Sequence, residues 1–267
     1  EVIRGRQTCD AALAHALDFV AQLKKTPILV NDSRGFFTSR FIGAFINEGV
    51  TMVKEGIDPA LIENAARMTG YPVGALTISD EIGLDLAYKG AQQQAQDLGK
   101  DNKPGSSVDV MATMVATHGR HGRKNGKGFY EYDADGSKRL WPGLGDIWPR
   151  RPAAEQPNVQ EVKHRMLYAQ FADAARCIAD GVLIDPADGD IGGCFGVGFP
   201  IYLGGPFAAM DTIGIAAVVA ECDRLAARYD AERFAVPNLL REMAAEGKTF
   251  YGPKRIVPPA RQAMRVS

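Results

Sequence analysis

The chain has 267 residues, of which 46% are hydrophobic and 24% charged, and its formal net charge is -1. This composition is typical of a soluble globular protein with one large domain or two of ordinary size. A nearly neutral chain offers no bulk electrostatic attraction for nucleic acid or an anionic membrane, and no apolar run is long enough to cross a bilayer. The four cysteines are scattered without metal-ligand spacing, which predicts free thiols, no metal site and a reducing, cytoplasmic location.

The first 30 residues predict one helix and one strand. Apolar residues recur at helical spacing over 8–25, and Thr26-Pro-Ile-Leu-Val30 follows as a short, β-branched strand. Because a single strand is not stable, we expect this one to pair with a sheet that the chain does not itself supply. The first residue is Glu1 rather than an initiator methionine, so we expect the chain to begin inside a longer protein.

Helical periodicity follows from residue 36 onward. Its buried stripe is expected to consist of Phe41, Phe45, Val50, Met52 and Val53. Asp58 is expected to cap the next helix, with Pro59 in its first turn. Ser79 or Asp80 is expected to cap a third helix.

Residues 133–157 contain four prolines and both tryptophans. This composition predicts an inter-module linker that lies on the surface and is held there by packing of Trp141 and Trp148. A second helical module is expected from residue 158 onward.

The chain contains one pattern twice, in residues 40–85 and 165–215. Each copy reads helix, Asp-Pro, helix, Gly-aromatic-Pro, and then Asp-x-Ile-Gly before another helix. The matching segments are Ile57-Asp-Pro59 with Ile184-Asp-Pro186, Gly70-Tyr-Pro72 with Gly198-Phe-Pro200, and Asp80-x-Ile-Gly83 with Asp211-x-Ile-Gly214. A repeat of this length predicts two copies of one helical module that pack on each other.

Two segments are candidate ligand sites on local grounds. Residues 31–40 run from a strand into a helix, where free backbone N–H groups favour anions and polar groups. The alternative for this turn is that Asp32 and Ser33 only cap it. The basic, glycine-rich turn 118–127 is either a phosphate-binding loop or a solvated one, and its spacing does not match a P-loop.

Several motifs, in matching order, resemble the 3-hydroxyacyl-CoA dehydrogenase family. Residues 25–40 are similar to the junction at which that family's NAD-binding domain passes into its helical domain. Gly70-Tyr-Pro-Val-Gly74, Asp80-x-x-Gly83 and Gly126-Lys-Gly-Phe-Tyr130 resemble motifs of the helical domain. Residues 198–206 resemble the second helical copy of the multifunctional α-subunit of the bacterial fatty acid β-oxidation complex.

The resemblance implies a mainly α fold. Two homologous helical modules, 34–132 and 158–267, would pack as a pseudo-dimer and be joined by the linker 133–157. Residues 1–33 would be the C-terminal helix-strand remnant of a Rossmann-type NAD-binding domain. The glycine-rich dinucleotide turn of that domain is absent from the sequence, so NAD binding would need residues outside this chain.

The resemblance also implies an activity, the NAD-dependent oxidation of (3S)-3-hydroxyacyl-CoA in fatty acid β-oxidation. The family's catalytic His lies upstream of a Leu-Val-Glu-Val-Ile segment, and Glu1 would be the carboxylate that orients this His. Ser39 stands where the family has a substrate-binding Asn, and Phe195 where multifunctional members have a substrate-contacting Tyr. Lys124 aligns with a lysine that approaches the NAD. Arg34 replaces a proline and is either a cation near the CoA phosphates or a member of a surface salt bridge.

The isolated chain is predicted to be inactive, because it lacks the His and the nucleotide-binding turn. Two other functions stay open. In the first, the chain would be a non-catalytic helical scaffold that docks a thiolase subunit. In the second, it would belong to a related dehydrogenase that acts on other hydroxyacids. The duplicated module disfavours the second alternative, and an enoyl-CoA hydratase domain upstream would exclude it.

Overall fold

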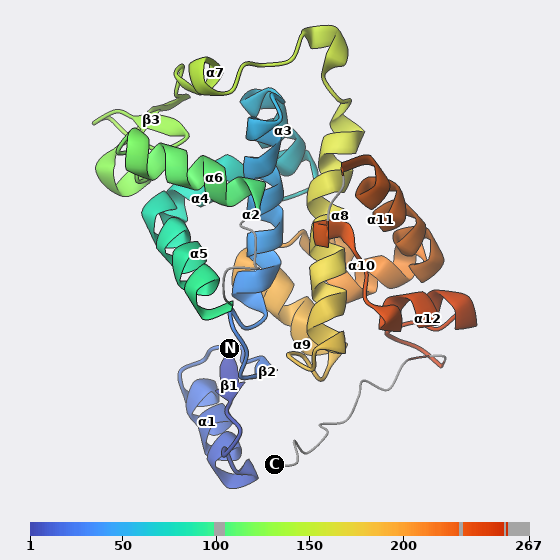
Figure 1. The fold of residues 1–267 in the computed structure, drawn as a ribbon. Coiled ribbons are helices and arrows are strands. Elements are labelled where there is room, and N and C mark those ends of the chain that lie inside the picture. The colour runs from blue at the N-terminus through green and yellow to red at the C-terminus, as the bar shows by residue number, and fades with distance from the viewer. Residues whose placement is uncertain (99–104, 230–231, 254, 256–267) are drawn as a thin grey trace. The chain divides into compact units, whose positions relative to one another are not determined.

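The computed structural model describes residues 1–98, 105–229, 232–253 and 255, and most of these residues are helical (Figure 1). The prediction of a mainly α fold is therefore confirmed. The chain divides into two units, Glu1–Ala44 with Leu167–Ser267, and Phe45–Met166. The helices α2 (Thr38–Lys54) and α8 (Val159–Ala179) each contribute to both units.

The N-terminal segment forms a small parallel sheet. Strand β1 (Val2–Arg4) pairs with β2 (Leu29–Asn31), and helix α1 (Asp10–Gln22) connects them. The expectation that the chain supplies no partner for the strand near residue 30 was therefore wrong. The partner was missed because a three-residue strand gives too short a pattern to recognise in sequence.

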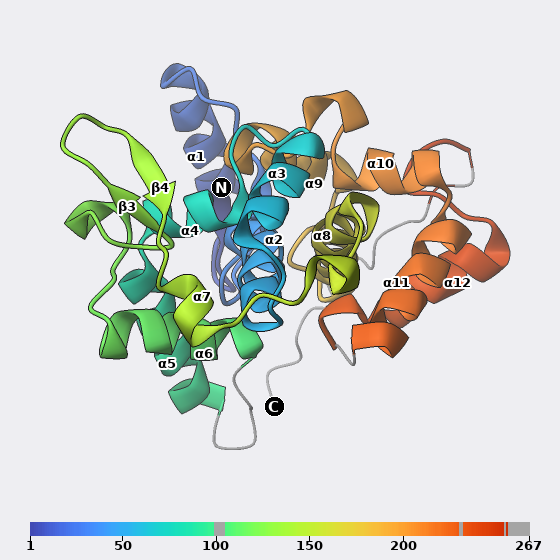
Figure 2. The same cartoon turned by 90° about the horizontal axis from the view of Figure 1, so that it is seen from above.

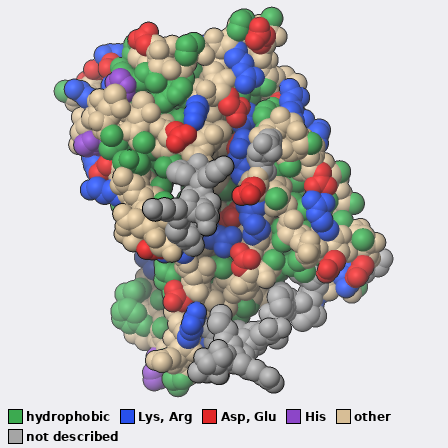
Figure 3. Space-filling view, in the orientation of Figure 1, with side chains coloured by type: hydrophobic (Ala, Val, Ile, Leu, Met, Phe, Trp, Pro, Cys, Tyr) green, Lys and Arg blue, Asp and Glu red, His purple; other side chains and the backbone are tan. Residues whose placement is uncertain are grey.

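Helix α1 buries none of its residues among those described. Phe19 and the following Leu23 are 59% and 54% exposed. Exposed hydrophobic side chains are visible in the lower part of Figure 3, where α1 lies. A helix with large apolar side chains in water is a marked departure from the amphipathic pattern of a helix on a folded domain.

One arginine of each copy pairs with acidic residues of the other copy. In the unit Glu1–Ala44 with Leu167–Ser267, the guanidinium of Arg40 on α2 donates to Asp173 at 3.1 Å and to Asp180 at 3.2 Å. Both acids lie at the C-terminal end of α8 or just after it. In this unit, therefore, the start of α2 lies against the end of α8.

The unit Phe45–Met166 contains the reverse arrangement. Arg165 on α8 donates to Glu48 at 2.5 Å and to the two oxygens of Glu55 at 2.6 and 2.8 Å. In the repeat, Arg165 stands where the first copy has Arg40, and the acidic positions also match. This contact is therefore the counterpart of the first with the copies exchanged.

The unit Phe45–Met166 is built from short helices and one hairpin, as Figures 1 and 2 show. The elements are α3 (Pro59–Met68), α4 (Ala75–Ile82), α5 (Leu84–Leu98), α6 (Ser106–Ala112), the π-helix η1 (Thr113–Thr117), the 3-10 helix η2 (Arg123–Asn125), β3 (Tyr130–Tyr132), β4 (Lys138–Leu140), α7 (Leu144–Ile147) and the 3-10 helix η3 (Ala153–Glu155). The predicted cap is confirmed, since the Asp58 carboxylate accepts a hydrogen bond from the Ala60 amide at 2.9 Å. Pro59 occupies the first turn of α3 as expected.

The predicted linker 133–157 is more structured than expected. Its strand β4 pairs with β3 in antiparallel fashion, and the two strands lie side by side in Figure 2. Trp141 packs over the guanidinium of Arg120, which lies 4.0 Å from the ring centroid. The predicted anchoring by this tryptophan is thus confirmed, but the segment begins as part of a hairpin.

Asp80 does not cap a helix, which corrects the expectation for the Asp-x-Ile-Gly motif. It lies in the last turn of α4, and its carboxylate accepts the amides of Phe129 and Tyr130 at 2.8 and 2.9 Å. In the second copy, Asp211 accepts the amides of Phe250 and Tyr251, both at 2.9 Å. The repeated aspartate therefore holds the Phe-Tyr turn of its own copy.

The second copy contributes most helices of the other unit. They are α9 (Pro186–Ile191), the π-helix η4 (Gly192–Gly196), the 3-10 helix η5 (Ile201–Leu203), α10 (Pro206–Ile213), α11 (Ile215–Tyr229), the 3-10 helix η6 (Glu232–Phe234) and α12 (Asn238–Glu246). Helices α11 and α12 pack side by side (Figures 1 and 2). Between Asp-Pro and Gly-aromatic-Pro the second copy has one residue more than the first, and η4 falls in this interval. An inserted residue within a helix is accommodated as a π-turn.

Candidate active site

A strained turn precedes α2 and orients its first amides. Gly35 and Phe36 both have positive φ values, 75° and 48°. The left-handed region is ordinary for glycine but costs free energy for phenylalanine, so the surrounding structure must impose it. The turn leaves the amides of Phe37 and Thr38 free of helical partners at the N-terminus of α2.

Glu1 occupies these free donors. Its Oε1 accepts the amide of Phe37 at 2.9 Å and that of Thr38 at 3.0 Å, and its Oε2 accepts the hydroxyl of Thr38. A carboxylate is stabilised at a helix N-terminus by the helix dipole as well as by these hydrogen bonds. The structure therefore holds the predicted catalytic carboxylate at a defined place, while Glu1 remains exposed.

Ser39 and Phe195 belong to the same unit as Glu1. Ser39 is exposed in the first turn of α2, one residue after Thr38. Phe195 lies in η4 and is 73% exposed. The residue after it, Gly196, lies so close to α2 that an added Cβ would be 3.3 Å from Thr38 Cγ2.

Glycines allow η4 to approach the strand and the helix of the site. A Cβ on Gly192 would lie 2.5 Å from Ile28 Cδ1, and one on Gly193 would lie 3.4 Å from Phe41. Side chains at these positions would push η4 away. The structure thus brings the sequence-predicted residues Glu1 and Ser39 together with the backbone that carries Phe195.

Lys124 belongs to the other unit, Phe45–Met166. It lies in η2, and its ammonium pairs with Asp85 Oδ2 at 2.5 Å. The hydrogen bond from Lys124 is the main cause that lowers the pKa of Asp85. The sequence has no G-x-G-x-x-G turn, the motif by which Rossmann-type domains bind a dinucleotide.

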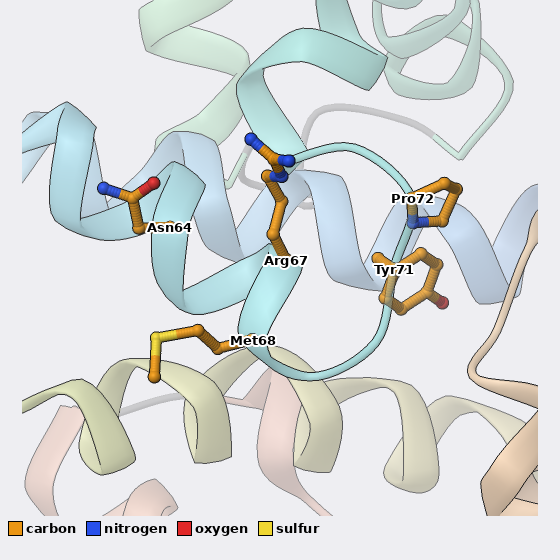
Figure 4. A pocket seen from close by; sticks show the side chains of 5 residues that line it. All are labelled: Asn64, Arg67, Met68, Tyr71 and Pro72. Atoms are coloured by element: carbon orange, nitrogen blue, oxygen red, sulfur yellow. The ribbon is translucent and has the colours of Figure 1, made fainter.

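An open cavity of about 620 Å³ lies at the end of α3 (Figure 4). The side chains around it come from the last turns of α3 and the loop that follows: Asn64, Arg67, Met68, Tyr71 and Pro72. None of the predicted site residues lines it. The cavity holds no acid-base pair, since its one ionisable side chain other than the Tyr71 phenol is the exposed Arg67. We therefore place the candidate chemistry at the start of α2 instead.

The described residues show two further absences. They contain no group of three or more His, Cys, Asp or Glu side chains that could hold a metal ion. Within the same part of the chain, no helix is long and apolar enough to span a bilayer. The site at α2 thus consists of the Glu1 carboxylate, the exposed polar side chain of Ser39 and the exposed apolar side chain of Phe195. Such a set can orient a neighbouring group and contact a ligand, but it has no nucleophile–base pair.

Thr38 is the residue of this site that the sequence did not reveal. Its partner Glu1 lies 37 positions away, so no local motif could indicate the contact. The one available signal was a hydroxyl residue in the first turn of a predicted helix, which normally suggests a cap.

Comparison with known proteins identifies the class. The sequence pattern of the family "3-hydroxyacyl-CoA dehydrogenase, C-terminal domain" matches residues 35–132 and again residues 162–253, and the chain belongs to this family. The predicted resemblance is thereby confirmed. The pattern occurs twice, in agreement with the repeat read from the sequence.

Particular relatives are named as subunits of a complex. The chain is 36% identical over 253 residues to the fatty acid oxidation complex subunit alpha of Shewanella amazonensis, and 34% identical over 252 residues to that of Shewanella loihica. In both cases the match covers 94% of this chain and 35% of the relative. The chain thus spans about a third of the length of these relatives.

Solved structures share the fold. A 3-hydroxybutyryl-CoA dehydrogenase from Escherichia coli K12 has a TM-score of 0.66 at 17% identity, over 91% of this chain and 66% of that one. The dehydrogenase part of multifunctional enzyme 1 from C. elegans has a TM-score of 0.64 at 23% identity, over 90% of this chain and 55% of that one. At these identities the likeness establishes the fold.

Proposed function

We propose that the chain is the C-terminal part of an NAD-dependent (3S)-3-hydroxyacyl-CoA dehydrogenase of fatty acid β-oxidation. The observation that carries the proposal is the Glu1 carboxylate, which three donors hold at the start of α2 beside Ser39. A fixed, exposed carboxylate is suited to orient an imidazole that arrives from outside the described residues. Family membership supplies the reaction class.

Each site residue has a proposed role. Glu1 holds the tautomer of a histidine base and stabilises the imidazolium that forms when the base takes the proton of the 3-hydroxyl. Ser39 donates a hydrogen bond to the acyl-CoA near its 3-oxygen or thioester. Phe195 packs against the acyl or pantetheine part, and Lys124 approaches the cofactor. NAD, held by a nucleotide-binding domain outside this chain, would accept the hydride.

The domain plan 1–33, 34–132, 133–157 and 158–267 is part of the proposal. Parallel pairing of β1 with β2 through α1 is the connection found in Rossmann-type sheets, and the apolar side chains exposed on α1 would be covered by the rest of such a domain. This supports the assignment of residues 1–33 as a remnant of the NAD-binding domain.

The exchanged arginine contacts support a pseudo-dimer of the two modules. Arg40 pairs with Asp173 of the other copy, and Arg165 pairs with Glu48 of the first. Reciprocal contacts between equivalent positions are the mark of a two-fold interface. The domain boundaries themselves remain predictions, and the expected end of the second module at 256–267 lies outside the described residues.

Assays of turnover and NAD binding on the full-length polypeptide and on this chain test the function. The natural full-length polypeptide should reduce acetoacetyl-CoA with NADH, whereas a chain with the 28.8 kDa mass of these 267 residues should bind no NAD and show no turnover. In the full-length protein, Glu1→Gln should lower kcat at least about tenfold, as expected for loss of support to a general base. Glu246→Gln, at an exposed residue of α12, is the matched control.

The alternative function, a cytoplasmic scaffold that docks a thiolase subunit, makes the opposite forecast. It would be favoured by a stable thiolase complex together with no acyl-CoA binding to the full-length polypeptide. Turnover by the 28.8 kDa chain alone would refute the assignment of the missing His and nucleotide domain as essential.

A further inference from the structure

We propose that Thr38 is a positioning residue that fixes the plane of the Glu1 carboxylate. The inference rests on the proposed function only for its consequence in catalysis. The contact itself is a feature of the structure, because the Thr38 hydroxyl donates to Glu1 Oε2.

The two oxygens of Glu1 are held by different kinds of donor. Oε1 accepts two backbone amides, from Phe37 and Thr38. A substitution of either side chain leaves these N–H donors present. Among the described residues, Oε2 receives only the hydroxyl of Thr38. Without this hydroxyl the carboxylate is held only by the two amides at Oε1, so it can rotate about Cγ–Cδ and protects these amides less. An imidazole oriented by a carboxylate requires that plane to be fixed.

The hydroxyl donates to a residue outside its own helix. A capping threonine accepts a hydrogen bond from an amide of its own first turn. Here the side chain of Thr38 lies within α2 and donates away from the helix, toward a residue 37 positions earlier. A cap would stabilise α2 whatever the orientation of Glu1. The observed contact instead restrains the orientation of the Glu1 carboxylate.

The second copy restrains Thr38 from the opposite side. Its methyl carbon Cγ2 faces Gly196 of η4, where an added Cβ would lie 3.3 Å away. A β-branched side chain has few rotamers, so a neighbour at the methyl limits where the hydroxyl can point. The π-helix of the second copy thus reaches the carboxylate of the site through one side chain.

The test uses the full-length polypeptide with Thr38→Val and Thr38→Ser. Valine keeps the shape and removes the donor, and serine keeps the donor. We expect Thr38→Val to lower kcat about tenfold with KM nearly unchanged, the scale of one hydrogen bond to a charged group. Thr38→Ser should recover most of the loss. Thr113→Val, which removes a hydroxyl bonded to its own helix at Asp109, is the matched control.

The pH profile separates positioning from a merely structural role. A poorly oriented carboxylate stabilises the imidazolium less, so the base should titrate at lower pH in Thr38→Val. Reduction of acetoacetyl-CoA needs the protonated base, so its rate falls as pH rises. In Thr38→Val this fall should begin at a lower pH. A loss of folded enzyme would lower the whole profile and leave its midpoint in place.

A second route uses Gly196→Ala. The new methyl should press on Thr38 Cγ2 and lower kcat in the same direction. The effect should disappear in the double variant with Thr38→Ser, which lacks Cγ2. Equal losses from Gly196→Ala in both backgrounds would contradict the proposed restraint of Thr38.

Amide hydrogen exchange tests whether Thr38 holds Glu1, and it does not depend on turnover. In the full-length protein, the peptide that contains Phe37 and Thr38 should exchange faster in Thr38→Val than in wild type, and Thr38→Ser should match wild type. Unchanged exchange together with unchanged kcat in Thr38→Val would overturn the inference. If wild type shows no dehydrogenase turnover, the proposed function fails, while the exchange result still settles whether Thr38 holds Glu1.

Discussion

Replacing Arg165 by methionine should strongly destabilise the protein. Its side chain and that of Glu48 are both 0% exposed, and Glu55 is 23% exposed. Burial on its own lowers the pKa of Arg165, but attraction to Glu48 and the hydrogen bonds with Glu55 outweigh it, so the pKa is raised. The arginine is therefore charged in the folded state, and its removal takes from the buried Glu48 the guanidinium that pairs with it.

The cost follows from that burial. Removing one partner of a buried ion pair costs about 3–5 kcal/mol, because the other charge remains without compensation. For a chain of this size that loss lowers Tm by about 6–20 °C. Arg40, the equivalent residue of the first copy, is 21% exposed and its partner Asp180 is 56% exposed. Its replacement by methionine should cost between the about 1 kcal/mol of an exposed pair and the about 3 kcal/mol of a buried one.

Urea denaturation of four proteins measures these costs. They are wild type, Arg165→Met, Arg40→Met and the double variant Arg165→Met with Glu48→Gln. The double variant should recover part of the lost free energy of unfolding, because glutamine is neutral and leaves no uncompensated buried charge. Equal costs at the two arginines, or no recovery by Glu48→Gln, would refute the reasoning from burial.

Three further predictions concern the first helical module, 34–132. Burial raises the pKa of Asp80 to about 6. Since the folded-state value lies above the unfolded value of about 3.9, its contribution to stability is present below about pH 4 and is lost as pH rises through 6. The cost of Asp80→Asn, measured by denaturation, should therefore be up to about 3 kcal/mol larger near pH 4 than near pH 7.5, and a pH-independent cost would contradict this. In α2, Gly49→Ala should destabilise by about 1–3 kcal/mol, because its Cβ would lie 2.5 Å from Ala75 Cβ. In α5, a Cβ added to Gly90 would meet nothing within 4 Å, so Gly90→Ala should stabilise by about 0.5–1 kcal/mol. Thermal melts that rank the two variants in the reverse order would contradict this argument.

Local sequence patterns predicted those features whose partners are close in the chain. Asp58 was predicted as a cap, and its carboxylate accepts an amide two positions later. Asp185, its match in the repeat, makes the same contact. The helices that follow them begin with proline, as the motif indicates. The repeat made the same local information available twice.

Features with distant partners were missed or misassigned. The role of Asp80 depends on amides 49 and 50 positions away, so its motif suggested a cap that it does not form. Strand β1 depends on β2, which follows it only after the whole of α1. The contact of Glu1 with Thr38 is of the same kind. No periodicity connects such residues, and only the folded chain brings them together.

The equivalent carboxylates of the two copies show what the fold requires of each. Glu63 accepts the Leu76 amide at 2.6 Å and the Tyr130 hydroxyl at 3.0 Å. Asp190 accepts the corresponding Phe207 amide and Tyr251 hydroxyl, both at 2.7 Å. One side chain is a methylene longer than the other, yet both connect the start of the following helix to the tyrosine of the Phe-Tyr turn.

Within this shared frame, the two copies differ in the helix that follows Asp-Pro. The first copy continues from Asp-Pro through the regular helix α3, whereas the second breaks into η4 with an additional residue. A π-turn makes poorer use of backbone hydrogen bonds than an α-turn, so the frame alone gives no reason for it. Its glycines instead allow close approach to Ile28 and Thr38, and its one large side chain, Phe195, is left in solvent. The π-helix of the second copy thus brings its backbone close to Ile28 and to the first residue of α2, a contact that the regular helix α3 has no counterpart for in the first copy.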